Sequence, residues 1–263
     1  MNVQAASPDC LLDRMRTLRN QLLFATALLI AASALAQVPK LDPYVPEHKP
    51  RVATVTFSLD FPGSDPSHYA MSVEAAGDAA YASDVDQNPA YATPSSSGGA
   101  VPLERYDVKF TMPQATRERI FALAQKLKYF QGSFDYTKGR IANTGAKKLV
   151  YADESRYFET SYNWSQNEDI QELTRIFQSV GASLEFGRRL EHQYRYTKLA
   201  LDDELKRMED AANAGELLAI EAVAPTLEKI VNDRSVLHIA RIRAQRLLAR
   251  AGPAQGATSP TTH

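Results

Sequence analysis

The sequence has very little cysteine: among its 263 residues the only one is Cys10. Beyond residue 10 the chain therefore offers no disulfide, no thiol nucleophile, no iron–sulfur cluster and no cysteine-ligated zinc site. Secreted domains that lack a large core are usually cross-linked by disulfides. We expect this chain to be stabilised by the packing of its core alone, which its length allows.

The sequence also lacks a strong excess of charge, with 30 Lys and Arg against 31 Asp and Glu. Residues 1–36 contain three Arg and two Asp, so their removal leaves 27 basic and 29 acidic residues and a net charge of −2. Proteins that bind nucleic acid or anionic membranes electrostatically are usually basic. We therefore expect no nucleic acid among the partners, and no membrane once residues 1–36 are removed.

One long apolar run lies near the N-terminus and is typical of a cleavable signal peptide. Three arginines at positions 14 to 19 precede Leu22–Ala36, which contains no charged residue and ends in Ala-Leu-Ala. As a helix the run would span about 22 Å, less than the roughly 30 Å of a bilayer core. We expect cleavage between Ala36 and Gln37 and a secreted or periplasmic protein, with a retained anchor as the alternative.

Composition and periodicity divide the chain into five segments. Residues 37–50 carry four prolines at nearly regular spacing, which favours an extended arm. Farther on, the hydrophobic period changes from that of strands to that of helices. The predicted segments are a signal peptide (1–36), a proline-rich arm (37–50), an α+β domain (51–186), a helical region (187–250) and a disordered tail (251–263).

Alternating apolar residues predict six strands in the α+β domain. In the first of them Val55, Phe57 and Leu59 share one face. The fold class that we expect is α+β, with a mostly antiparallel sheet of about six strands packed with helices and followed by an all-α region. The predicted strands are 51–60, 68–74, 79–83, 104–111, 148–151 and 157–162.

Helical periodicity begins at Ser165, which forms a capping-box pattern with Glu168. The apolar stripe continues to about residue 213, and we expect Gly181 and Gly187 to kink or split this element. Two shorter helices are predicted after it, at 216–232 and 236–250, the second of them capped by Ser235.

Two stretches carry a resemblance to known proteins. The order of strand meander, helix, strand pair and helix, carried by Arg105–Pro113 through Tyr162–Asn167, resembles small exported bacterial modules of unknown function. That resemblance implies a location in the cell envelope and no known catalysis. Residues 224–233, with the alanines and arginine that follow at 240–244, resemble one helical hairpin of the HEAT type. Solenoids need several repeats, so we interpret the hairpin as a local packing solution.

Motifs that could carry chemistry depart from their functional patterns. The stretch Gly139–Lys147 has five residues between its glycines and no hydroxyl after a lysine, so we interpret it as a turn into the next strand. The spacing of Tyr194 and Lys198 matches that of short-chain dehydrogenases, but no dinucleotide-binding fingerprint accompanies it. We therefore predict no cofactor and name no catalytic residue.

Metal-binding patterns are also incomplete. Asp84, Asp86 and Asn88 alternate as in the start of a calcium loop, but the later glycine and glutamate positions hold Pro89 and Ser95. A solvated polar loop is the simpler interpretation. The histidines at 48, 68, 192 and 238 have no partner at three or four residues, so no zinc helix is predicted and no metal ligand is named.

The densest group of aromatic residues, together with nearby arginines, is a possible interaction patch. The alternative is that the rings fill the core and the arginines lie on helix surfaces. The patch residues are Tyr157, Tyr162, Trp164, Arg188, Arg189, Tyr194 and Tyr196.

Three functions remain open at this point. The first hypothesis is a non-enzymatic cell-envelope protein that binds an unknown protein partner. The alternative is a periplasmic hydrolase or small-ligand-binding protein whose site is assembled from distant residues. A calcium-stabilised module is the third.

The signal-peptide hypothesis makes a direct prediction. N-terminal sequencing of the protein recovered from the envelope or medium of expressing cells should begin at Gln37, because signal peptidase cuts after small-x-small sequences. Recovery of a form that still carries Leu22–Ala36 would contradict cleavage and indicate a tethered protein.

Overall fold

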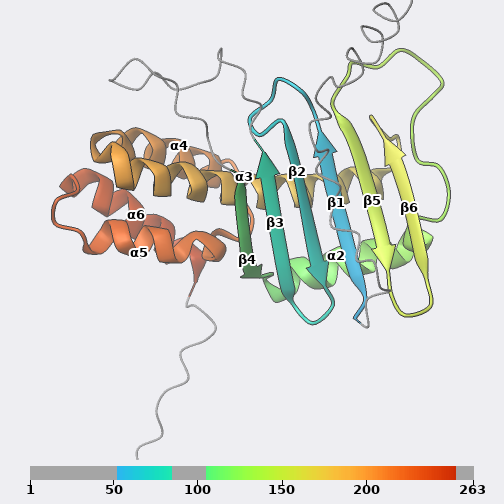
Figure 1. Cartoon of the computed structure of the whole chain (residues 1–263), viewed down its shortest axis with the longest axis horizontal. Helices are drawn as coiled ribbons and strands as arrows, with labels where there is room; N and C mark the ends of the chain where they lie inside the picture. The colour runs from blue at the N-terminus through green and yellow to red at the C-terminus, as the bar shows by residue number, and fades with distance from the viewer. Residues whose placement is uncertain (1–51, 85–104, 253–263) are drawn as a thin grey trace, which may run out of the picture. The chain divides into compact units, whose positions relative to one another are not determined.

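The computed structural model describes residues 52–84 and 105–252. Within these ranges it contains one six-stranded antiparallel sheet and five α-helices (Figure 1). The predicted α+β class, with a six-stranded sheet packed with helices and a helical region after it, is confirmed. The predicted signal peptide with its cleavage site, the proline-rich arm and residues 253–263 lie outside the described residues.

Each predicted strand has a counterpart in the sheet, with ends that differ by a few residues. Neighbouring strands are antiparallel throughout, in the order β4-β3-β2-β1-β5-β6. Val55 and Phe57 of the central strand are fully buried, as their alternation predicts. The strands are β1 (Thr54–Asp60), β2 (His68–Glu74), β3 (Asp78–Asp84), β4 (Tyr106–Thr111), β5 (Ala146–Ala152) and β6 (Tyr157–Tyr162).

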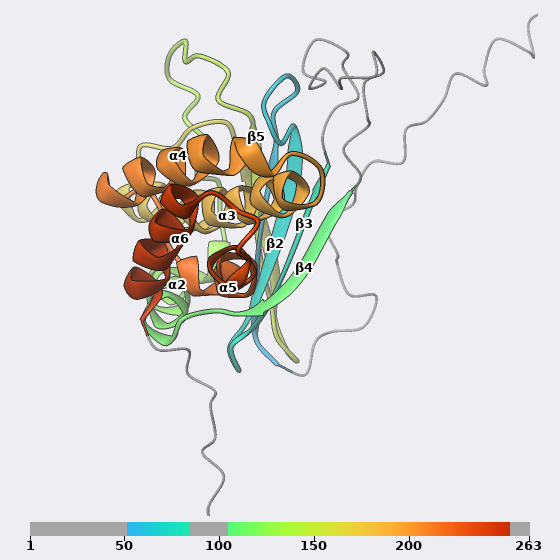
Figure 2. The ribbon, with the colours of Figure 1, turned by 90° about the vertical axis from the view of Figure 1, so that its left-hand side faces the viewer.

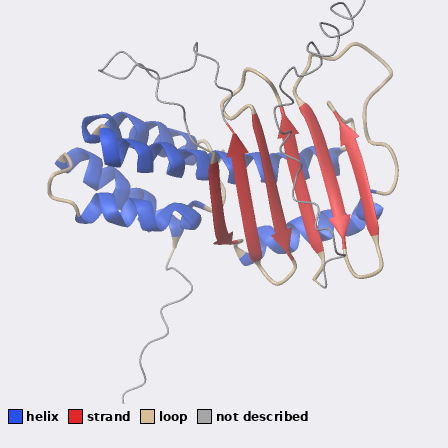
Figure 3. Ribbon diagram, in the orientation of Figure 1, coloured by secondary structure: helices blue, strands red, loops and turns tan. Residues whose placement is uncertain are grey.

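The helices cover one face of the sheet and extend beyond its β4 edge. Figure 2 shows α2 and α3 on the same side of the strands, and Figure 3 shows the remaining helices gathered past β4. The helices are α2 (Gln114–Lys126), α3 (Glu168–Tyr196), α4 (Leu201–Asn213), α5 (Ala224–Asn232) and α6 (His238–Ala251).

Helix α3 belongs to two hydrophobic clusters. Its N-terminal half packs on the sheet, where Phe177 stacks on Phe57 with ring centroids 5.2 Å apart. Its C-terminal half contributes Leu190 to a second cluster with α4, α5 and α6. The predicted boundary between residues 186 and 187 falls inside this one continuous helix.

The start of α3 differs from the predicted capping box. Asn167 is the cap: its side-chain oxygen accepts from the backbone N–H groups of Asp169 at 3.0 Å and Ile170 at 3.1 Å. Ser165 lies outside the helix, and its hydroxyl accepts from the N–H of Asn167. The capping-box prediction was wrong because the side chain of Asn167, two residues after Ser165, satisfies the free N–H groups at the start of α3.

The glycines of α3 do not interrupt it, so the predicted kink or split is wrong. The helix ends instead at Thr197, whose φ and ψ of −146° and 60° leave the helical region. Gly187 allows a close approach, since a Cβ atom there would lie 2.1 Å from Cγ1 of Val223. Gly181 faces the ring of Tyr69, from which a Cβ would lie 3.6 Å. Both glycines therefore serve packing contacts made far away in sequence.

The last two helices also differ in detail from their predicted bounds. The predicted helix 216–232 is a short 3₁₀ turn at Ile220–Val223 followed by α5, with Pro225 in the first turn of α5. Ser235 is not a cap, because α6 begins three residues later without a side-chain cap. The N–H of Ser235 donates instead to Asp233, which shapes the connecting turn.

The close contact at Gly187 predicts a sharp difference between the two glycines of α3. Gly187→Ala should lower the free energy of unfolding by about 1–3 kcal/mol, because the new methyl group overlaps Val223. Gly181→Ala, where the contact is ordinary, should leave stability unchanged or raise it by up to about 1 kcal/mol. Urea unfolding measures both, and equal effects of the two substitutions would contradict the packing at Gly187.

Candidate functional site

The candidate site is a groove along one face of α3. It consists of two adjoining cavities that follow one another along the helix and share Gln178. The helix residues that line them recur every three or four positions, as residues on a single helical face do. This surface, here called the α3 groove, takes from α3 the residues Ile170, Gln171, Thr174, Arg175, Gln178, Gly181, Ala182, Glu185, Phe186 and Arg189.

The opposite wall of the groove lies at one end of the strands, together with the loops that follow them. Strand register places Asp60 beside both His68 and Ala146, so β1 ends where β2 and β5 begin. From Gln171 to Arg189 the helix rises about 27 Å, which is the length of about eight extended residues. The wall residues of the first cavity, the tyrosine cavity, are Leu59, Phe61, Ser64, Asp65, Pro66, Tyr69 and Tyr81. Those of the second, the tryptophan cavity, are Thr144, Lys147, Tyr162, Asn163, Trp164 and Ser165.

The tyrosine cavity has a volume of about 260 Å³ and a wall rich in aromatic rings. The rings of Tyr69 and Tyr81 lie 5.6 Å apart beneath it. At its far end the guanidinium of Arg189 lies 4.7 Å from the centroid of the Phe186 ring and donates to the buried carboxylate of Glu204 at 2.7 Å. The cavity thus combines apolar contact area with the guanidinium of Arg189, whose charge is paired with that of Glu204.

A buried carboxylate, Glu185, organises this cavity. It accepts hydrogen bonds from the hydroxyls of Tyr81 at 2.9 Å and Ser83 at 2.7 Å, and from Nε of Arg188 at 2.5 Å. Arg188 also donates to Asp65 at 3.1 Å. Buried charges need this degree of pairing, and here the pairing joins β3, α3 and the β1–β2 connection.

The network has two electrostatic consequences. Burial and the charge of Glu185 raise the pKa of Tyr81 well above its usual value, so this phenol stays a hydrogen-bond donor. Burial also raises the pKa of Tyr106 to about 12. Arg188 is only 6% exposed, and its Nη1 atom has no hydrogen-bond partner in the described structure.

The tryptophan cavity has a volume of about 320 Å³. The half-buried indole of Trp164 packs edge-on against Tyr136, with ring centroids 5.4 Å apart. Arg175 lies on the exposed rim. Its acidic neighbour on the helix, Glu172, is held through both oxygens by Arg119 at 2.6 and 2.5 Å. The guanidinium of Arg175 is therefore available to a ligand.

Lys147 places a buried positive charge in the wall of the tryptophan cavity. Its ammonium donates to the carbonyl oxygens of Thr144, Gly145 and Asn163 at 2.8, 3.1 and 2.9 Å, and to the hydroxyl of Thr144 at 2.9 Å. Burial lowers its pKa below 10.5, with no acidic group opposing the shift. In the described part of the chain this charge is held by neutral oxygens alone.

The structure brings three of the seven predicted patch residues to the groove. Tyr162 and Trp164 line the tryptophan cavity, and Arg189 lines the tyrosine cavity. The hydroxyl of Tyr162 bonds to that of Thr174 at 2.6 Å, so its polar end faces α3. Arg188 lies directly behind the tyrosine cavity in the Glu185 network.

The other three patch residues lie elsewhere. Tyr157 is at the opposite end of β6, where its hydroxyl donates to Glu159. Tyr194 donates to Asp233, and Tyr196 is 71% exposed at the end of α3 with its ring against His192. The seven residues therefore do not form one surface.

Several groove residues were not predicted. Asp65 and Lys147 lie far in sequence from Arg175 and Glu185 of α3, and no local spacing links the four. The only available signal is the polar stripe at three- and four-residue spacing along α3, which by itself is also the pattern of a solvated helix face.

The two motifs set aside in the sequence have structural roles. Residues 139–145 lead into β5 without a following helix, as the turn interpretation predicts. Tyr194 and Lys198 both bond to Oδ2 of Asp233, at 3.0 and 2.6 Å, and so tie the end of α3 to the end of α5.

Within residues 52–84 and 105–252, no cluster of three or more His, Asp or Glu side chains could hold a metal ion. Asp84 ends β3, while Asp86 and Asn88 of the calcium-like pattern lie outside the described residues. None of the described helices is both long and apolar enough to cross a bilayer.

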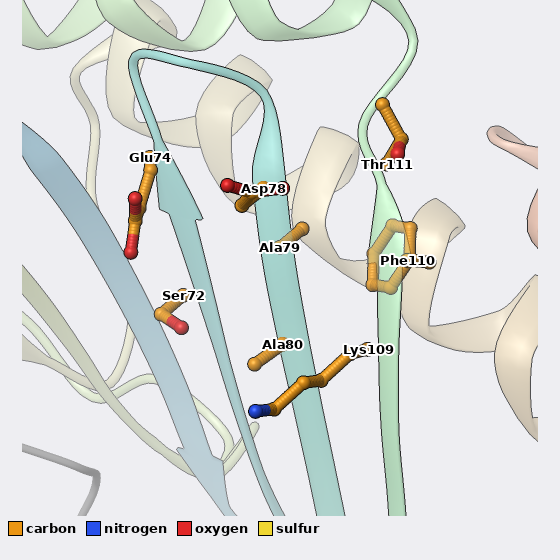
Figure 4. Close-up of a pocket in the computed structure, with 8 residues that line it drawn as sticks. All are labelled: Ser72, Glu74, Asp78, Ala79, Ala80, Lys109, Phe110 and Thr111. Carbon is orange, nitrogen blue, oxygen red and sulfur yellow. The ribbon is translucent and has the colours of Figure 1, made fainter.

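A third cavity, of about 460 Å³, lies over β2, β3 and β4 (Figure 4). Ser72, Ala80 and Lys109 point to the side of the strands that the helices leave uncovered. Its wall contains a single aromatic ring, that of Phe110. The α3 groove, with several rings and convergent charged groups, is the better candidate for a binding site.

Comparison of the sequence with protein-family models and with curated proteins finds no match.

The Glu185 network predicts a large and specific effect on stability. Glu185→Gln should lower the free energy of unfolding by about 3–5 kcal/mol, because it removes the buried counter-ion of Arg188 and leaves only the more exposed carboxylate of Asp65. The double variant Glu185→Leu with Arg188→Met should recover most of that loss. As a control, Glu191→Gln on the same helix, where the charge is more exposed, should cost less than about 1 kcal/mol. Comparable losses at both glutamates in urea unfolding would refute the network's role.

Proposed function

We propose that this chain is an exported cell-envelope protein whose α3 groove binds an extended segment of a partner protein. The observation that carries the proposal is the groove itself: two adjoining cavities along some 27 Å of one helix face, lined by rings and charged side chains. An extended segment of about eight residues matches that length. The export part rests on the apolar run Leu22–Ala36.

The chemistry of the lining suits recognition of a peptide. Trp164, Phe61 and Phe186 are large, and such rings dominate the binding energy of protein interfaces. Arg175 and Asp65 stand on the rim, where charged groups select partners and orient them. Alternating side chains of an extended segment could fill the two cavities while its backbone bonds to Gln178.

The same geometry favours binding over hydrolysis. Oε1 of Glu185 already accepts from Tyr81 and Ser83, and Oε2 accepts from Arg188. A carboxylate with every oxygen engaged by donors is a poor general base. Asp65 is in turn held by Arg188.

A second candidate function is the binding of a small ligand in the tyrosine cavity alone. The convergence of Asp65, Glu185 and Arg189 around one aromatic cavity favours it. Its volume of about 260 Å³ is slightly below that of typical ligand sites, whereas the whole groove is larger. The peptide proposal uses both cavities and is therefore preferred.

Selection from a random ten-residue peptide library against residues 37–263 tests the proposal. The enriched peptides should compete for one site. Trp164→Ala should weaken the binding of a synthetic selected peptide about 30-fold, the cost of about 2 kcal/mol of losing an aromatic anchor. Ala182→Trp should abolish binding by filling the groove.

The matched control is Tyr157→Ala, which removes a patch aromatic that lies outside the groove and should change affinity less than twofold. Thermal unfolding of each variant reports on folding independently. Selected peptides whose affinity is unaffected by Trp164→Ala and Ala182→Trp would overturn the groove as the binding site.

A further inference from the structure

We infer that the tryptophan cavity is a carboxylate subsite, which receives a carboxylate group of the bound segment. The inference rests on the proposed function and adds the chemistry and direction of the ligand. The cavity contains two cationic side chains, Lys147 and Arg175, and no acidic residue. The tyrosine cavity, by contrast, is lined by Asp65 and Glu185 as well as Arg189.

The buried charge of Lys147 is the first reason for an anion here. The side chain is 6% exposed and is bonded only to neutral oxygens. Neutral oxygens satisfy its hydrogens but do not cancel its charge, so a positive potential extends into the adjoining cavity. A carboxylate placed there would supply the missing counter-charge in a partly desolvated site, where such interactions are strong.

Arg175 supplies the donor that can reach the ligand. It stands one turn before Gln178 on the same face of α3, on the exposed rim of the cavity. Glu172, its acidic neighbour, is already held by Arg119. A guanidinium has a planar fork of donors that matches a carboxylate. Lys147 therefore sets the potential, Arg175 binds the anion, and Trp164 provides the apolar wall.

This arrangement also orients the segment. Arg175 and Arg189 are separated by about 21 Å along the helix axis. With its carboxylate at the tryptophan cavity, the segment would extend over Gln178 toward Asp65, where an amine or basic side chain finds an acidic partner. The shared chemistry is a carboxylate, which a protein partner can supply from its C-terminus or from an acidic side chain.

Small probes test the subsite without needing the peptide. We propose ¹H–¹⁵N NMR titrations of residues 37–263 with N-acetylphenylalanine and with its amide. The carboxylate should bind at least fivefold more tightly than the amide and should shift the amide resonances of Thr144 and Gln171 and the indole of Trp164. N-acetylglutamate amide is the third arm. Tighter binding of N-acetylphenylalanine indicates a terminal carboxylate, and tighter binding of N-acetylglutamate amide indicates a side-chain carboxylate.

Two variants and one titration separate the subsite from a structural role. Arg175→Gln should reduce the fivefold preference to less than twofold, while the charge-matched Arg246→Gln on α6 should leave it intact. In ¹³C-lysine spectra, the pKa of Lys147 should rise when N-acetylphenylalanine is added, because an anion favours the charged form.

Equal binding of the acid and the amide, absence of binding by either, or a preference that survives Arg175→Gln would overturn the carboxylate subsite. None of these outcomes affects peptide selection at the groove, so the proposed function is tested independently by that selection. Conversely, a carboxylate preference in the absence of any selected peptide would support an anion site and contradict the binding of an extended partner segment.

Discussion

The buried ion pair between Glu185 and Arg188 lies at the point on which the rest of the structure depends. It sits in the middle of α3, and its hydrogen bonds reach Tyr81 and Ser83 on β3 and Asp65 in the β1–β2 connection. On one side of this point α3 packs on the sheet, and on the other it packs on α4, α5 and α6. Both hydrophobic clusters contain residues of α3. The rotation of α3 about its axis and its distance from the sheet must therefore suit the packing of both clusters.

That constraint also makes the groove. Buried charges hold α3 to the sheet, and one polar face of α3 then lies beside the strand ends, where β1 ends and β5 begins. Gly181 brings that face close to Tyr69, and the rings of Tyr69 and Tyr81 form a floor. Most residues that line the groove lie on α3 or on strands of the sheet, and the rest lie in the loops beside them.

Local sequence patterns predicted the fold well and the site only in part. The alternation of Val55, Phe57 and Leu59 revealed a strand because strand faces repeat every two residues. The density of aromatic and basic residues around Trp164 and Arg189 indicates a possible surface. No sequence pattern indicates Glu185, because its partner Tyr81 is 104 positions away in sequence. Gly187 suggests a kink in the sequence alone, because the side chain that it makes room for, Val223, lies in the 3₁₀ turn before α5.

We propose the α3 groove as the surface at which this protein binds its partner. The most direct measurement is ¹H–¹⁵N NMR of residues 37–263 saturated with a library-selected peptide, with every shifted amide assigned. Binding in the groove should shift only amides of the segments 59–69, 144–147, 162–165 and 171–189. Shifts confined instead to the third cavity, around Ser72, Ala80 and Lys109, would contradict it.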